Sequence, residues 1–199
     1  ILNSIPFTRD VVSFFRDVNA QVHLYLKPKA ETAMKFTEPE LRAKADNLID
    51  QMKIAKRSGT TVAFYSAIVG SIPGEVDTAI QVLKHFVAYL REKYIGMFII
   101  NPAEHFIEGM DADDLMYMWE IVQRSGLIDI WRFQTFSDIE RSFELMGKKV
   151  PPIWSGKDST YSTGCTKEMQ IALDVQKERP EMQIIGPSHE KFFRRREYG

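Results

Sequence analysis

The stretch that decides the fold runs from residue 60 to residue 100 and reads TTVAFYSAIVGSIPGEVDTAIQVLKHFVAYLREKYIGMFII. Its first six residues form a β-rich run without helical period, which predicts a buried strand. Between residues 75 and 94 the apolar residues recur at helical spacing, and Gly96 ends this predicted helix before a second strand at 97–100. Parallel strands joined by such a helix make a right-handed crossover. The stretch therefore predicts an α/β domain.

The chain after residue 100 continues this alternation of helices and strands. We expect three more helices, at 111–124, 137–146 and 166–177. We expect strands at 127–133, at 182–185 and, despite its two prolines, at 150–154. Such alternation predicts a three-layer α/β sandwich with a mostly parallel, flavodoxin- or Rossmann-like sheet.

The first 57 residues have a helical pattern and are predicted to form an N-terminal helical extension, which precedes an α/β domain over residues 58–199. Thr8 can cap a first helix. Thr37 gives a stronger start signal, because Glu40 lies three residues on and can complete a capping box.

The composition narrows the class of partner. Lys and Arg number 26 against 27 Asp and Glu, so the net charge of −1 gives no overall field that would favour a nucleic acid polymer or an acidic membrane. No apolar run approaches the roughly 20 residues that a membrane span needs. The chain has one cysteine, which fits a reducing compartment, and we expect a cytoplasmic protein.

A loop of small and polar residues at 154–166 runs into the last long predicted helix, whose first turn carries Glu168. Small residues let a ligand approach the backbone, and the free N–H groups of a helix start attract an anion. A sugar phosphate could be held there beside Glu168. Alternatively, Ser162 or Thr163 simply caps the helix, and Glu168 is a favourable first-turn acid. Cys165 has no convincing partner base, so we expect it to be a packing residue.

In open parallel sheets, ligands bind beyond the carboxyl ends of the strands. The loops predicted there are 65–74, 101–110 and 154–166. His105 lies in the second of these loops, where solvent exposure is the simplest expectation. The acids at 111–114 have no His or Cys set beside them, so we expect neither a metal ion nor a cofactor.

Several short motifs follow one another in a familiar order. They are VAFYSA at 62–67, IINPAE at 99–104, PIW at 152–154 and STGCTKEMQIA at 162–172. With this order and spacing, the chain resembles the nucleoside 2-deoxyribosyltransferase-like superfamily over residues 60–186. That superfamily includes nucleoside deoxyribosyltransferases and nucleoside 5′-monophosphate N-glycosidases.

The resemblance implies that Glu168 is the catalytic carboxylate. It would attack the anomeric carbon and displace the base, forming a glycosyl-enzyme that water or a second base resolves. The transition state resembles an oxocarbenium ion, which an ionised carboxylate stabilises. Ser162, Thr163 and Gly164 would bind the 5′-oxygen or phosphate.

Other positions follow from the same resemblance. Tyr65 and Ser66 would line the sugar or orient the catalytic carboxylate, and Asp111 or Asp114 could protonate the leaving base. Further substrate-binding candidates are Asn101 and Trp154, although Trp154 is equally well interpreted as a core residue.

The resemblance thus implies an N-glycosidase that acts on a nucleoside or a (deoxy)nucleoside 5′-monophosphate, and it favours a homodimer or larger assembly. The alternatives are a deoxyribosyltransferase that exchanges bases and a non-catalytic nucleotide-binding or sensing module on the same fold. A third alternative is an interaction protein whose first 57 residues bind a partner.

Overall fold

The computed structural model describes residues 36–105 and 109–198 of the chain. Within these residues four parallel strands form one sheet in the order β2-β1-β3-β4. The strands are β1 (Thr61–Ser66), β2 (Met97–Ile100), β3 (Ile130–Phe133) and β4 (Gln183–Ile185). In the register of the sheet, Ala63 of β1 lies opposite Ile99 of β2 and Ile130 of β3. The predicted parallel sheet is confirmed.

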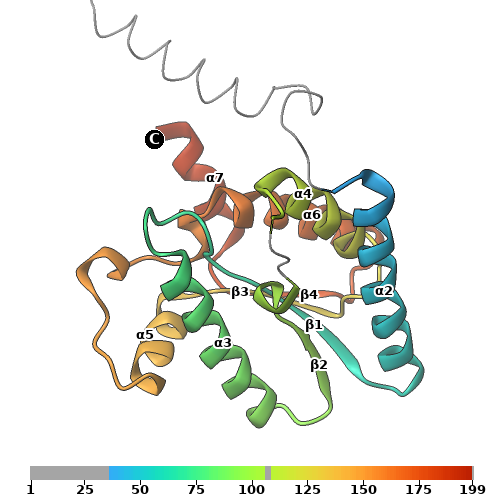
Figure 1. Ribbon diagram of the computed structural model, residues 1–199, viewed down its shortest axis with the longest axis horizontal. Helices are drawn as coiled ribbons and strands as arrows, with labels where there is room; N and C mark the ends of the chain where they lie inside the picture. The colour runs from blue at the N-terminus through green and yellow to red at the C-terminus, as the bar shows by residue number, and fades with distance from the viewer. Residues whose placement is uncertain (1–35, 106–108, 199) are drawn as a thin grey trace, which may run out of the picture. The chain divides into compact units, whose positions relative to one another are not determined.

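Helices cover both faces of the sheet (Figure 1). One face carries α2 (Glu38–Arg57), α4 (Ala112–Gln123), α6 (Thr163–Glu178) and α7 (His189–Tyr198), and the other carries α3 (Val76–Lys93) and α5 (Phe136–Leu145). Shorter 3-10 turns lie between them, namely η1 (Pro102–His105), η2 (Pro152–Trp154) and η3 (Ser159–Tyr161). The arrangement is the predicted three-layer α/β sandwich.

Strand β1 is buried on both faces, so its side chains alternate between two cores. Val62 and Phe64 pack with the residues of α2, α4 and α6, and Phe64 meets the ring of Trp119 edge-on at 5.4 Å. Ala63 and Tyr65 pack beneath α3 on the other face. This alternation decides which side chains at the end of β1 can share a site.

Helix α2 begins as the sequence predicts. Thr37 is the N-cap, the Glu40 N–H donates to its hydroxyl, and the Glu40 carboxylate accepts the Thr37 N–H at 2.7 Å. The helix buries four residues against the sheet: Leu41, Ala45, Leu48 and Met52.

The compact unit that contains the sheet runs from residue 36 to residue 199, so the domain boundary that we predicted at residues 57/58 falls inside it. The rest of the predicted extension, residues 1–35 with the Thr8 signal, lies outside the described residues.

Asp129, the residue before β3, links the C-terminal end of α2 to the sheet through hydrogen bonds and ion pairs. Its carboxylate accepts from the Lys56 ammonium at 2.5 Å, from the Val62 N–H at 2.9 Å and from the Arg179 guanidinium at 3.3 Å. The side chain of Asp129 thus accepts the hydrogen bond of the Val62 N–H, next to the first paired residues of β1 and β3. Strand β3 accordingly starts at Ile130 rather than at the predicted residue 127.

Two local predictions are wrong. Residues 150–154 are not a strand, since Pro151 and Pro152 have no N–H for a ladder, and the segment forms η2 instead. Helix α5 is capped by Thr135 rather than by Ser137, because Asp138 completes a capping box with Thr135.

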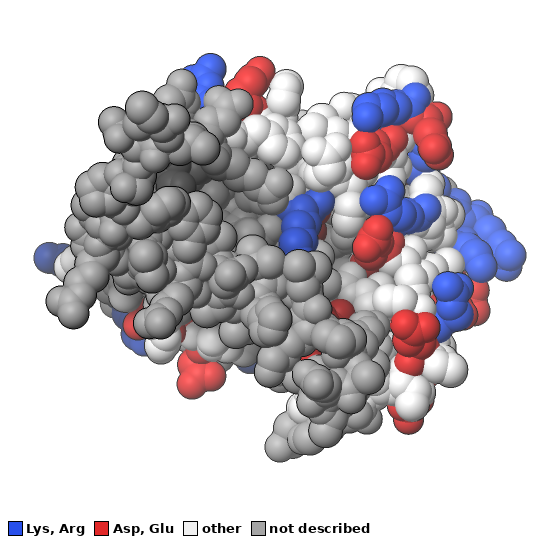
Figure 2. All heavy atoms as spheres, turned by 90° about the horizontal axis from the view of Figure 1, so that it is seen from above, with Lys and Arg blue, Asp and Glu red and all other residues white. Residues whose placement is uncertain are grey.

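The surface shows charges of both signs. On the part of the face in Figure 2 that is not grey, Lys and Arg lie among Asp and Glu, and neither sign forms a broad patch. Among the described residues, no helix is both long and apolar enough to cross a membrane.

Candidate functional site

The strand order of the sheet reverses between β1 and β3, and open α/β folds bind ligands at such a reversal. The chain passes from β1 outward to β2 and then back across to β3, so the connections leave in opposite directions between β1 and β3. Ser66 ends β1 at this point, and its carbonyl accepts the Gln134 N–H at 2.8 Å. The carboxyl ends of β1 and β3 are therefore held together where a ligand site is expected.

Glu168 lies on α6 beside this point and is buried, with 9% of its surface exposed. Its Oε1 accepts the Gln123 side-chain N–H at 2.9 Å. Ser66 and Cys165 also act on its carboxyl, and each favours the ionised form. The Trp131 indole donates to the Ser66 hydroxyl at 2.8 Å. We call these five residues, Ser66, Gln123, Trp131, Cys165 and Glu168, the Glu168 cluster.

Burial dominates the electrostatics of Glu168. Loss of solvent raises the pKa of its carboxyl to about 7, and the hydrogen bonds from Ser66, Gln123 and Cys165 oppose this rise only in part. Near neutral pH both the ionised and the neutral forms are populated. The ionised form can act as a nucleophile, and the neutral form can donate a proton.

Cys165 is a neutral thiol. Only 2% of it is exposed, and burial, together with the charge of Glu168, raises its pKa well above the usual range. A thiol that stays protonated is a poor nucleophile. The structure confirms the prediction that Cys165 is a packing residue.

The loop before α6 contains the helix cap. The Ser162 hydroxyl accepts the Cys165 N–H at 3.3 Å, and its carbonyl accepts from the Thr166 hydroxyl at 3.0 Å. Capping by Ser162, which the sequence left as one of two alternatives, is confirmed. Thr163 is exposed and Gly164 is partly exposed on the first turn, so both are open to a ligand.

Tyr65 does not join the Glu168 cluster, which corrects its predicted role. It follows Phe64 on the opposite face of β1, where its hydroxyl hydrogen-bonds to the Asp138 carboxylate at 3.3 Å. Arg132 holds the same carboxylate at 2.6 Å. Burial, reinforced by the charge of Asp138, raises the pKa of Tyr65 well above its usual range, so Tyr65 stays a neutral partner within this core.

Asp111 and Asp114 form the capping box of α4. The Asp111 carboxylate accepts the Asp114 N–H at 2.8 Å, and the Asp114 carboxylate accepts the Asp111 N–H at 3.4 Å. Asp111 is exposed, whereas Asp114 is fully buried and its Oδ1 has no partner among the described residues. Nine residues of helix put Asp114 about 13 Å along the axis from Gln123. The structure therefore does not bring either acid to Glu168.

The two remaining candidates, Asn101 and Trp154, lie in different parts of the fold. Asn101 directly follows β2 and is 1% exposed. Its Oδ1 accepts the Ala103 N–H at 3.0 Å, and its Nδ2 has no partner among the described residues. Trp154 is fully buried under α3 and α5, where its indole donates to Glu75 at 2.8 Å. The core interpretation of Trp154 is confirmed, and its predicted role in substrate binding is corrected.

Sequence reasoning missed Gln123. It lies on α4 among apolar residues such as Trp119 and Val122, and it is fully buried. A polar residue on an otherwise apolar helix face was the available signal, because a buried amide needs a partner. Its partner Glu168 is 45 positions away, which no local pattern connects.

Within the described residues no group of three or more His, Cys, Asp or Glu side chains could hold a metal ion. Comparison of the chain with protein-family models, with curated proteins and with solved structures finds no match. The assignment of function therefore depends on the site itself.

Proposed function

We propose that the protein cleaves the N-glycosidic bond of a nucleoside or a (deoxy)nucleoside 5′-monophosphate, with Glu168 as the nucleophile. The observation that carries this proposal is the position of Glu168, a buried carboxyl beside the end of β1 at the point where the sheet connections diverge. The resemblance to the nucleoside 2-deoxyribosyltransferase-like superfamily supports the same residue.

The chemistry suits a carboxyl that is held by a hydrogen bond and that, within residues 36–105 and 109–198, is not paired with a cation. The ionised Glu168 attacks the anomeric carbon as the carbon–nitrogen bond breaks, and the base leaves with the electron pair and takes a proton from water. Water then hydrolyses the glycosyl ester and regenerates the carboxylate. Gln123 fixes the orientation of the carboxylate, because its side-chain N–H donates to Glu168 Oε1. Thr163 and Gly164, on the exposed first turn of α6, would meet the 5′-oxygen or phosphate.

The assembly and the location are proposed from the same resemblance and from the composition. We propose a homodimer or a larger assembly that acts in the cytoplasm. Size-exclusion chromatography with light scattering would test the assembly, and a monomer would contradict it.

The second candidate is a nucleotide-binding module without catalysis. The small exposed fraction of Glu168, 9%, favours it, because a nucleophile must reach its substrate. Both candidates predict nucleotide binding, but only the first predicts the appearance of free base.

The deciding experiment incubates the full chain with a panel of nucleosides and 5′-monophosphates and measures free base by chromatography. We expect base release by the wild type and a loss of at least about 10³-fold in Glu168→Gln. The matched control is Glu178→Gln, an exposed acid at the end of the same helix, which should keep full activity. Full activity of Glu168→Gln would refute the assigned nucleophile, and saturable binding without base release would favour the module.

A further inference from the structure

The aromatic core fixes the orientation of Trp131, the member of the Glu168 cluster that lies on β3. Its side chain is fully buried and lies opposite Phe64 of β1 in the sheet register. The Trp131 ring meets the Phe64 ring edge-on, with 5.4 Å between centroids, and stacks on the Phe133 ring at 6.0 Å. These contacts set the direction of the indole N–H, which no step of the proposed reaction uses.

The indole N–H reaches the end of β1. Ser66 follows Phe64 by two positions, so the two side chains lie on the same face of the strand. Trp131 extends from its place opposite Phe64 to Ser66, whose hydroxyl oxygen accepts the indole N–H at 2.8 Å. An indole N–H is a donor only, so the serine is the acceptor in this hydrogen bond.

The hydrogen bond from Trp131 determines what Ser66 can do for Glu168. A serine hydroxyl has a single hydrogen, and an oxygen that accepts from an indole keeps that hydrogen for another partner. Ser66 favours the ionised form of the Glu168 carboxyl, as a donor does. Ser66 and Trp131 are both fully buried, so bulk water does not compete for the hydroxyl.

From these contacts we propose that Trp131 is a positioning residue for Glu168 and acts through Ser66. The indole N–H holds the Ser66 hydroxyl in the rotamer that donates to the carboxylate. It thereby favours the ionised nucleophile that the glycosidase needs. The inference deepens the proposed function and rests on it for its purpose, but its main test needs no substrate.

The first test measures the ionisation of Glu168 itself. The full chain is labelled with ¹³C at its glutamate side chains, and the Glu168 carboxyl signal is assigned by its absence from Glu168→Gln. Ser66→Ala should raise the midpoint of this titration by about one pH unit and Trp131→Phe by about half a unit, because the fixed donor is lost. The double variant should titrate as Ser66→Ala does, since the indole acts only through the hydroxyl.

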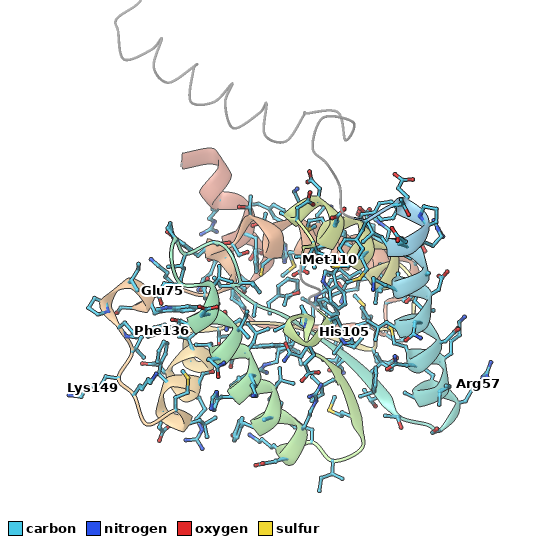
Figure 3. The ribbon with its side chains drawn as sticks, in the orientation of Figure 1. Arg57, Glu75, His105, Met110, Phe136 and Lys149 are labelled. Atoms are coloured by element: carbon cyan, nitrogen blue, oxygen red, sulfur yellow. The ribbon has the colours of Figure 1, made fainter. Side chains whose placement is uncertain are left out.

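Trp154→Phe is the matched control. The Trp154 indole also donates from a fully buried position at 2.8 Å, but to Glu75, which Figure 3 labels at the start of α3 on the other face of the sheet. This substitution removes the same group from the same kind of environment and should leave the Glu168 titration unchanged. An equal rise in Trp154→Phe would reveal a general loosening of the core and would overturn the proposal.

A second measurement, on the wild type, does not depend on whether Trp131→Phe folds. The chain has three tryptophans, so spectra of Trp119→Phe and Trp154→Phe assign the Trp131 indole N–H signal. This signal should shift with pH at the midpoint of the Glu168 titration. The shift should be lost in Glu168→Gln and at least halved in Ser66→Ala. An indole signal that stays constant while Glu168 titrates would overturn the proposal.

Base release measures the functional consequence. In Trp131→Phe the pH profile of kcat/KM should move to higher pH by as much as the Glu168 titration does, and the rate at high pH should approach that of the wild type. A residue that merely supports the fold would lower the rate at every pH. Absence of base release from the wild type would refute the glycosidase, and the two titrations would still decide the role of Trp131. The proposal fails if folded Trp131→Phe titrates as the wild type does, or if Trp131→Phe adds a further rise to that of Ser66→Ala.

Discussion

At the scale of single residues, the central feature is a buried carboxyl that accepts a hydrogen bond but pairs with no cation among the residues that the structure describes. Glu168 accepts a hydrogen bond from Gln123 at 2.9 Å, and burial raises its pKa to about 7 although Ser66, Gln123 and Cys165 favour the ionised form. By contrast, the exposed Glu104 is bound by Arg91, and its pKa is held below the usual range. A carboxyl without a counter-ion is costly in a core, so its presence at the end of β1 calls for a functional explanation.

The pKa of Glu168 predicts how base release depends on pH. A nucleophilic carboxylate must be ionised, so kcat/KM should rise with pH through about 7 and level off above it. Rates measured from pH 5 to 9 on one nucleotide substrate test this. A profile that falls across this range would assign Glu168 the part of an acid instead.

The same pKa predicts a change in stability with pH. Between about pH 4.5 and 7 the folded protein keeps the Glu168 proton while the unfolded chain releases it, so the free energy of unfolding falls as pH rises. The total fall due to this group is roughly 3 kcal/mol and is complete above pH 7. Below about pH 4.5 the contribution of Glu168 to the free energy of unfolding is fully present.

Glu168→Gln removes this titration, since an amide can still accept from Gln123 but carries no charge. Urea unfolding of both proteins at pH 5 and pH 8 measures how the free energy of unfolding changes between the two pH values. All other groups contribute equally to this change in both proteins, so only the wild type carries the additional fall that is due to Glu168. Between these two pH values the two proteins should differ by about 2.5 kcal/mol in their pH dependence. Identical pH dependence would contradict the burial of an ionisable group at this position.

Sequence reasoning placed some site residues and misplaced others for identifiable reasons. The loop-to-helix pattern located the Ser162 cap, because a cap depends on neighbours within a few residues. It placed Glu168 on the first turn of the helix, which is wrong, since α6 begins at Thr163 and Glu168 lies in its second turn. It wrongly joined Tyr65 to Glu168, because a strand buried on both faces is apolar throughout. Its sequence does not tell which face receives Ser66 and which receives Tyr65.

At the scale of elements, helices and strands with a clear period were predictable, and their ends were less so. Helix α3 and strand β2 lie where the apolar spacing placed them. Helix α6 begins three residues before its predicted start at 166, and α5 begins after a different cap. Helix ends depend on which of several nearby hydroxyls reaches a free N–H, and the spacing of apolar residues does not decide that.

The cap of α5 gives a direct test at this scale. The Thr135 hydroxyl accepts the Asp138 N–H at 3.2 Å, so Thr135→Ala should lower the free energy of unfolding by about 1 kcal/mol. Ser137 is exposed and lies inside the first turn, so Ser137→Ala should change it by less than about 0.5 kcal/mol. Urea denaturation of both variants measures the difference, and a larger effect at Ser137 would show that the cap is misassigned.

At the scale of the whole molecule, α2 completes the three-layer sandwich. Its helical pattern and its start were predictable, but its membership of the α/β unit was not. An amphipathic helix before the first strand can pack on its own sheet or on a partner, and its sequence is the same in both cases. The contacts of Leu41, Leu48 and Met52 in the core beside β1 settle its place.

Truncation tests this placement. Residues 36–199 should unfold cooperatively, whereas residues 58–199 should not, because removal of α2 exposes the apolar residues that it covers on β1 and α4. Thermal unfolding followed by circular dichroism distinguishes the two. A cooperative transition for residues 58–199 would show that α2 is dispensable, as an extension would be.

The most direct test of the whole account asks whether Glu168 forms a bond to the sugar. Wild-type protein is quenched with acid during turnover of a nucleotide substrate, digested and analysed by mass spectrometry. We predict that the peptide containing Glu168 carries the mass of the glycosyl group and that this adduct is absent from Glu168→Gln. Release of base with the adduct on another residue, or with none on any peptide, would contradict the claim that Glu168 is the nucleophile.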